Sequence, residues 1–269
     1  MTALISQDPA RLAALVGEVA LLVWAYMTLW FALALALRRN DIADVAWGLG
    51  FIVVAWWLLL RSDPRPPRLW IAAVLVTVWG LRLAWHIWSR RRGKPEDYRY
   101  AAWREQWGRW FVPRTYLQVF VLQGVFMLLI AMPLIVLAAE TPPSRPTMLG
   151  ALAVAVWLVG FMFETAADAQ LGAFLKQPEN RGHVIDRGLW KYSRHPNYFG
   201  ESLQWWGIWL LTLGVPGWFL AAIGPLTITL LLRYVSGVPM LERKRASQPE
   251  WEAYKARTSV FVPLPPRRG

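Results

Sequence analysis

The stretch "SLQWWGIWLLTLGVPGWFLAAIGPLTITLLL", residues 202–232, decides the fold because it is almost wholly apolar and contains no charged residue. A helix of about 20 predominantly apolar residues is long enough to cross a bilayer. The tetrapeptide "GVPG" at 214–217 interrupts the run, and Gly and Pro at such spacing favour a tight turn. The stretch therefore predicts a hairpin of two membrane helices, at 197–214 and 216–234.

The same pattern recurs along the rest of the chain and predicts an all-α, polytopic membrane protein with about seven spans. The Pro-rich segments "DPRPPR" (63–68) and "ETPPSRP" (140–146) mark turns where helices must stop. The first run is long and is followed by further spans, so we interpret it as a membrane helix and not as a signal peptide. We expect one transmembrane domain over residues 1–269. The five other expected spans are 12–37, 42–60, 69–89, 115–139 and 147–175.

Composition supports this class and excludes several kinds of site. The chain has 269 residues, of which 56% are hydrophobic and 19 are Trp, whereas soluble proteins are less apolar. Because there is no Cys and only three His, we expect no disulfide, no thiolate ligand and no metal site. The net charge of +12 is typical of basic loops that face anionic lipid, and we expect no nucleic-acid partner.

The distribution of basic residues predicts the orientation of the spans. Most of the 29 Lys and Arg residues fall in alternate loops and in the C-terminal tail, and basic loops stay in the cytoplasm. This asymmetry favours an outside N-terminus and an inside C-terminus, with the segments 90–114, 176–196 and 235–269 on one face. We expect that face to be the mouth of any site, on the cytoplasmic side of a bacterial inner membrane.

The tail, 236–269, alternates apolar and charged residues. Two interpretations stay open: a helix that lies on the lipid headgroups, or a segment that packs over the cytoplasmic mouth.

Ionisable residues inside the spans are the strongest indication of function, because charges there are costly and usually face a cavity or a partner. Polar residues four apart share a helix face, and three spans carry such pairs: Arg82 and His86, Glu164 and Asp168, Asn197 and Glu201. Together they predict an inward-facing polar pocket suited to an extended, polar cofactor.

Structural alternatives exist for the acidic residues. Asp41 and Asp44 suit a helix N-terminus, Glu164 and Asp168 suit an ion pair with Arg82, and Glu18 near the outer end suits snorkelling to the interface.

No GxGxxG or P-loop in the right context, no serine-nucleophile motif and no HExxH motif occurs. However, "DRGLWKYSRHPNYFGE" (186–201) resembles the signature of the steroid 5α-reductase-like membrane proteins, in particular their uncharacterised bacterial branch. "DIADVAWGLGF" (41–51), "RLAWHIWSRRRGKPEDYRYAAWR" (82–104) and "SGVPMLERKRASQPEWEAYKARTSVFVP" (236–263) resemble the same branch. The wider superfamily includes sterol reductases and isoprenylcysteine carboxyl methyltransferases.

The resemblance implies a cofactor site for NADPH. In the steroid reductases the matching Asn and Glu hold the nicotinamide carboxamide, which implies that role for Asn197 and Glu201; such side chains satisfy both donors and acceptors. Glu164 and Asp168 resemble an Asn and Asp pair of the family, with Glu in place of Asn. For the phosphates and adenosine, the resemblance and the basic character of the segments favour Arg187, Lys191, Tyr192, Arg194, His195, Arg243 and Lys244.

The residues that would contact the substrate differ from those of the steroid reductases. Steroid reductases polarise the enone carbonyl with a Gln–Glu pair in the second span and a Tyr in the third, whereas this chain has "DVAWG" in that region. The best catalytic replacements are Asp44, Arg82, His86 and a Tyr, either Tyr26 or Tyr98.

The sequence therefore favours an NADPH-dependent reductase of a conjugated C=C in a lipophilic, steroid-like substrate, acting as a monomer in the bilayer. One alternative is an S-adenosylmethionine-dependent methyltransferase of a lipid or lipid-linked substrate. The other is a non-enzymatic lipid-binding protein.

Overall fold

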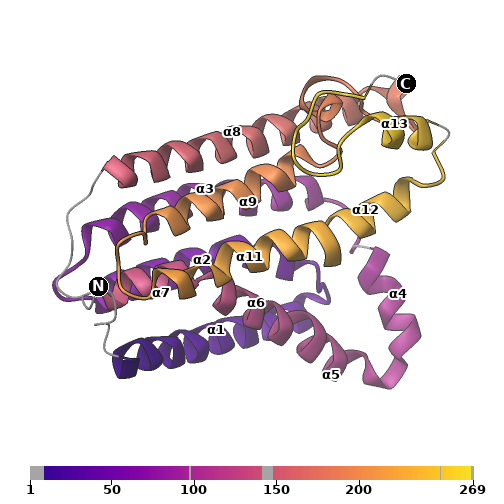
Figure 1. Ribbon diagram of the computed structural model, residues 1–269. Helices are drawn as coiled ribbons and strands as arrows, with labels where there is room; N and C mark the ends of the chain where they lie inside the picture. Colours follow the sequence, from indigo (N-terminus) through magenta and orange to yellow (C-terminus); the bar gives the residue numbers. More distant parts are fainter. Residues whose placement is uncertain (1–8, 97, 141–147, 249, 268–269) are drawn as a thin grey trace. The chain divides into compact units, whose positions relative to one another are not determined.

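The chain is helical throughout its described part. A computed structural model describes residues 9–96, 98–140, 148–248 and 250–267, and no strand occurs there, although Ser193 and Ser259 form one isolated β-bridge. The all-α prediction is confirmed. The main helices (Figure 1) are α1 (Pro9–Leu37), α2 (Ile42–Arg61), α3 (Pro67–Arg91), α4 (Tyr98–Trp107), α5 (Phe111–Thr115), α6 (Leu122–Ile130), α7 (Met132–Ala139), α8 (Met148–Lys176), α9 (Pro196–Leu210), α10 (Trp218–Ala221), α11 (Ile223–Leu230), α12 (Val238–Arg245) and α13 (Trp251–Arg257).

Six helical segments of the described residues are long and apolar enough to cross a membrane, so the protein is a multi-pass membrane protein. The expected span at 197–214 corresponds to α9, which has 15 residues and is not among the six. The count of seven and the orientation therefore remain predictions. The six segments are Pro9–Leu37, Ile42–Arg61, Pro67–Arg91, Ala102–Ile130, Met148–Lys176 and Trp218–Arg243.

The span expected at 115–139 is wrong in its bounds. The helical segment begins earlier, at Ala102, and ends at Ile130. A new helix, α7, begins immediately after Ala131, with Pro133 in its first turn. Proline lacks an N–H and fits the start of a helix better than its interior, which explains the division.

The described residues form two compact units, one of residues up to 140 with 211–224, the other of 148–210 with 225–267. In the first unit α7 is central: every one of its side chains is buried, and it contacts α1, α2, α3 and α10. α2 and α3 lie side by side because Gly48 and Gly80 face each other; a Cβ on Gly80 would lie 2.6 Å from the Gly48 carbonyl oxygen.

Helix α1 ends in a conformation that suits glycine, yet Arg38 occupies it. Its φ is 54°, the N–H of Arg38 donates to the Leu35 carbonyl at 3.2 Å, and the N–H of Arg39 donates to Ala34 at 3.0 Å. This is a Schellman ending, whose left-handed position strongly favours Gly.

We expect Arg38→Gly to raise the free energy of unfolding by about 0.5–1 kcal/mol, because it relieves the strain of the side chain at positive φ. Thermal unfolding in detergent measures the effect. Arg39→Gly is the matched control: it removes the 2.9 Å ion pair with the buried Asp41 and is expected to lower the melting temperature. A lower melting temperature for Arg38→Gly would contradict the prediction.

The second unit contains an antiparallel pair, α8 and α9 (Figure 1). It also contains α11 and α12, joined through a π-helical turn, Leu231–Val235. The C-terminal segment 258–267 follows α13 and returns to the residues that precede α9: the N–H of Arg194 donates to Ser259 at 2.8 Å, and the N–H of Leu264 donates to Tyr192 at 3.0 Å.

Candidate functional site

The polar residues of α8 and α9 are brought together by glycines. A Cβ on Gly160 would lie 2.6 Å from the Gly200 carbonyl oxygen, and a Cβ on Gly207 would lie 2.8 Å from the backbone nitrogen of Trp157. Small residues let membrane helices approach closely, so that their backbones nearly touch. Polar side chains on the facing sides of α8 and α9 are therefore close enough to form hydrogen bonds with each other.

Two of the predicted pairs meet across this contact. Asn197 Nδ2 donates to Asp168 Oδ1 at 3.2 Å, and Gln204 Nε2 donates to the buried Glu164 at 2.6 Å. Glu201 is also buried, with 7% of its surface exposed. The sequence prediction missed Gln204, although its spacing of seven residues from Asn197 places it on the same helix face.

Asn197 leaves one polar atom available. Its Nδ2 is taken by Asp168, whereas Oδ1 is buried and has no hydrogen-bond partner among the residues that the structure describes. Buried polar atoms are almost always hydrogen-bonded, so such an acceptor calls for a donor. A ligand with an N–H group, such as a carboxamide, fits it.

At the start of α9, Arg194 and His195 both contact Glu242 of α12. Glu242 Oε1 accepts from Arg194 Nε at 2.8 Å and lies 3.3 Å from His195 Nε2. Burial lowers the pKa of His195, and the hydrogen bond to Glu242 only partly opposes this, so the imidazole is neutral at pH 7. Because an ionised carboxylate only accepts, Nε2 carries the proton. The buried Nδ1 is then an acceptor without a partner in the described part of the chain.

The tail covers the segment that precedes α9. Trp251 and Tyr254 are buried against Val184, and the Tyr254 hydroxyl donates to the Trp190 carbonyl at 2.6 Å. Burial raises the pKa of Tyr254, which keeps this hydroxyl protonated. The tail therefore packs on residues 184–194; whether that surface is a cofactor mouth stays a prediction.

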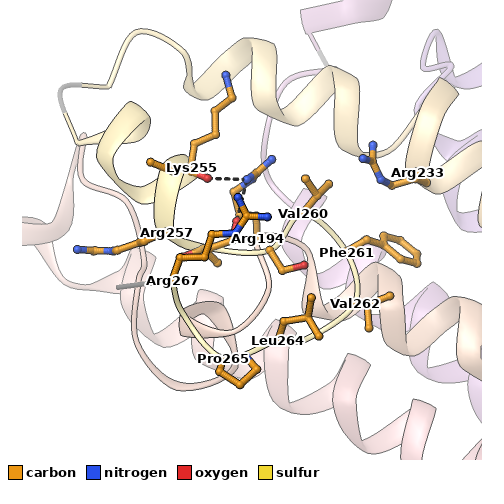
Figure 2. Close-up of a pocket in the computed structure, with 13 residues that line it drawn as sticks. Arg194, Arg233, Lys255, Arg257, Val260, Phe261, Val262, Leu264, Pro265 and Arg267 are labelled. Atoms are coloured by element: carbon orange, nitrogen blue, oxygen red, sulfur yellow. Dashed lines mark hydrogen bonds between the residues drawn. The ribbon is translucent and has the colours of Figure 1, made fainter. Parts of the chain in front are cut away.

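A basic pocket of about 480 Å³ lies beneath the C-terminal segment (Figure 2). None of the residues described as lining it is acidic. Figure 2 shows the guanidinium of Arg194 in the middle of the pocket, close to Arg267, while Arg233 projects from the neighbouring helix. Arg257 is bound to Asp186 at 2.5 Å. The five cationic lining residues are Arg194, Arg233, Lys255, Arg257 and Arg267.

Of these five, the sequence prediction named only Arg194. Arg233 lies in the π-helical turn between α11 and α12, and the three others come from the tail. Only the return of the tail therefore shows that they share a pocket with Arg194. The pocket lining does not include Arg187, Lys191, Tyr192 or Arg243, all of which are exposed. Arg187 instead lies over the Phe174 ring at 5.5 Å.

The predicted catalytic residues lie in the other compact unit. Asp44 belongs to α2, and Arg82 and His86 belong to α3, where all three are half-buried. The Tyr26 hydroxyl donates to the Ala46 carbonyl at 2.8 Å. The side chains of Tyr98 and, in the tail, Lys244 lie outside the described part of the structure.

No group of three or more His, Asp or Glu side chains suited to a metal ion occurs among the described residues.

Comparison with known proteins gives a family. Residues 30–258 match the family described as "Protein of unknown function (DUF1295)". The chain is 37% identical over 68 residues to "3-oxo-5-alpha-steroid 4-dehydrogenase 1" of Bos taurus, which covers 25% of this chain and 26% of the relative. It is 26% identical over 168 residues to "Uncharacterized protein C594.04c" of Schizosaccharomyces pombe, covering 53% of this chain and 48% of the relative.

The chain thus spans between a quarter and a half of the length of these curated relatives. No solved structure matches it.

Proposed function

The chain belongs to the DUF1295 family, and on this premise we propose that it is an NADPH-dependent membrane reductase of a conjugated C=C bond in a lipophilic, steroid-like substrate. The similarity to a protein named as a 3-oxo-5α-steroid 4-dehydrogenase supports the steroid-reductase-like class. The residues of the second compact unit support the choice of cofactor.

The buried Oδ1 of Asn197 is the observation that carries the proposal. Asp168 accepts from Nδ2 and thereby fixes the amide, so that Oδ1 is presented as an acceptor. A nicotinamide carboxamide offers two N–H donors and one carbonyl oxygen. Asn197 would accept one donor, and the neighbouring Glu201 on the same helix face would accept the other.

The basic pocket supports a cofactor with several phosphates. The lining holds five cationic side chains and, among the described residues, no acidic one. Arg194, Arg257 and Lys255 have carboxylate partners just outside the lining, in Glu242, Asp186 and Glu252. Five cations against three carboxylates still favour an anionic ligand. Arginine suits phosphate oxygens because its planar guanidinium donates two parallel hydrogen bonds. A 2′-phosphate adds negative charge, and for this reason we favour NADPH over NADH.

NADPH, when bound, supplies the hydride for the β-carbon of the enone. The residues of this chain hold the carboxamide, neutralise the phosphates and keep water out of the apolar part of the site. The carbonyl oxygen of the substrate needs a hydrogen-bond donor as negative charge develops on it. Asp44 in its protonated form, Arg82, His86, Tyr26 and Tyr98 are our candidates for this role.

The test is ligand-dependent thermal stability of the detergent-purified protein with NADPH, NADH and S-adenosylmethionine. We expect NADPH to raise the melting temperature most, and Asn197→Leu to lower the affinity by about 10-fold or more, because the variant removes the acceptor at nearly constant size. Thr165→Ala, an exposed neighbour of Glu164 on α8, is the matched control and should bind like the parent.

Two results would overturn the proposal. Stabilisation by S-adenosylmethionine alone would favour the methyltransferase alternative. Stabilisation by none of the three ligands, for a protein with a cooperative unfolding transition, would favour a non-enzymatic role.

A further inference from the structure

An open apolar groove lies on the first compact unit, and none of its lining residues is assigned above to the cofactor. Its volume is about 290 Å³, and it is formed by Val45 of α2 and by a stripe of α3. Ala84 is its buried floor, whereas the Trp85 side chain is 65% exposed and Trp88 is 41% exposed. The α3 residues that line it are Leu81, Ala84, Trp85 and Trp88.

A cluster of cations lies where this stripe ends. Arg92, one turn beyond Trp88, places its guanidinium 5.1 Å from the centre of the Trp88 ring. Arg91 lies 3.9 Å from Asp41, which also pairs with Arg39 at 2.9 Å. Asp41 thus pairs with two of the three guanidinium groups, and the charge of Glu96 also acts on Arg39. The three guanidinium groups outnumber these two carboxylates, so this end of the groove keeps a net positive charge.

The combination of an apolar groove, tryptophans and a positive end matches the two halves of a lipid. Trp side chains concentrate at the membrane interface, at the level of the headgroups. Basic pockets beside membrane helices bind anionic headgroups. Both helices that form the groove are long and apolar enough to cross a membrane, which makes bilayer lipid the natural occupant.

We propose that this groove is a binding site for one anionic phospholipid of the bilayer, whose acyl chain lies along Leu81, Ala84 and Trp85 and whose phosphate is held by Arg92 with Arg39 and Arg91. The positive charge at the end of the groove selects against a zwitterionic lipid, because the ammonium group of the latter would meet the same cations.

The full-length protein, purified in mild detergent, is tested by native mass spectrometry with an equimolar mixture of phosphatidylglycerol and phosphatidylcholine. We expect one phosphatidylglycerol to remain bound to the parent, in preference to phosphatidylcholine. Arg92→Gln should reduce the retained fraction about 10-fold, because a hydrogen-bonded charge contact is worth roughly 1.5 kcal/mol.

Two further variants test the apolar floor of the groove and the specificity of the charge effect. Ala84→Leu fills the floor of the groove and should also abolish retention while leaving the cations in place. Arg65→Gln, an exposed arginine in the loop before α3, is the charge-matched control and should retain lipid like the parent.

Equal retention of the two lipids, or unchanged retention in both Arg92→Gln and Ala84→Leu, would overturn the proposal. A dimer that Ala84→Leu dissociates would also overturn it, since the groove would then hold a second copy of the chain. None of these results bears on the proposed NADPH site, whose test uses other residues and another ligand.

Discussion

Gly200→Ala is expected to destabilise the protein by about 2–3 kcal/mol and to lower the melting temperature by roughly 5–10 °C. The added Cβ would lie 2.5 Å from both the backbone nitrogen of Glu164 and the carbonyl oxygen of Gly160. Backbone atoms cannot rotate away as a flexible side chain can, so α8 and α9 must separate. Separation would also break the hydrogen bond between Asn197 and Asp168, and we therefore expect the proposed binding of NADPH to be lost.

Gly172→Ala is the matched control for this variant, because Gly172 lies on α8, the helix that packs against α9, and a Cβ there meets no atom within 4 Å. Replacing an unhindered helical glycine by alanine stabilises a helix by up to about 1 kcal/mol. Thermal unfolding and NADPH binding are compared for the two variants. If Gly200→Ala unfolds at the parent temperature and still binds NADPH, the close contact is not needed.

Arg194→Met is expected to cost about 3–5 kcal/mol, the usual result of removing one partner from a buried ion pair. Arg194 is 5% exposed. Its guanidinium binds Glu242 at 2.8 Å and donates to the backbone carbonyls of Thr258 at 2.8 Å and Lys255 at 3.0 Å. Methionine preserves most of the length but none of these bonds, so two carbonyls and a carboxylate lose a donor.

The measurement combines thermal unfolding with limited proteolysis of the tail. In Arg194→Met we expect cleavage within 250–267 well before the rest of the chain, because this arginine joins α9, α12 and the C-terminal segment. Arg257→Met is the control, since that arginine makes an exposed pair with Asp186 and such pairs contribute at most about 1 kcal/mol. Equal stability and equal protease resistance of the two variants would refute the prediction.

The variants Gly200→Ala and Arg194→Met test two different kinds of contact. Gly200 acts between neighbouring helices, whereas Arg194 holds segments that are about 50 to 65 residues apart in the sequence. A ligand-binding defect without unfolding is expected for Asn197→Leu but for neither of these two variants.

The sequence by itself determined the class of protein, since long apolar runs admit few structures other than membrane helices. It also determined which residues of α8 and α9 share a face, because helical periodicity is a local property: Asp168 and Asn197 were predicted as site residues and are hydrogen-bonded. The prediction of one span over 115–139 was wrong at Ala131, where a single apolar run contains the boundary between two helices. Hydropathy alone does not resolve such a boundary.

Only the tertiary structure decided what the tail does and which basic residues share a pocket. The tail was equally compatible with a surface helix, and its return to residues 184–194 depends on Trp251, Tyr254 and Arg194 finding their partners. Those partners are distant in sequence, and no periodicity relates them. For the same reason Arg233 and Arg267, which are ordinary basic residues in the sequence, become lining residues of one basic pocket only in the folded chain.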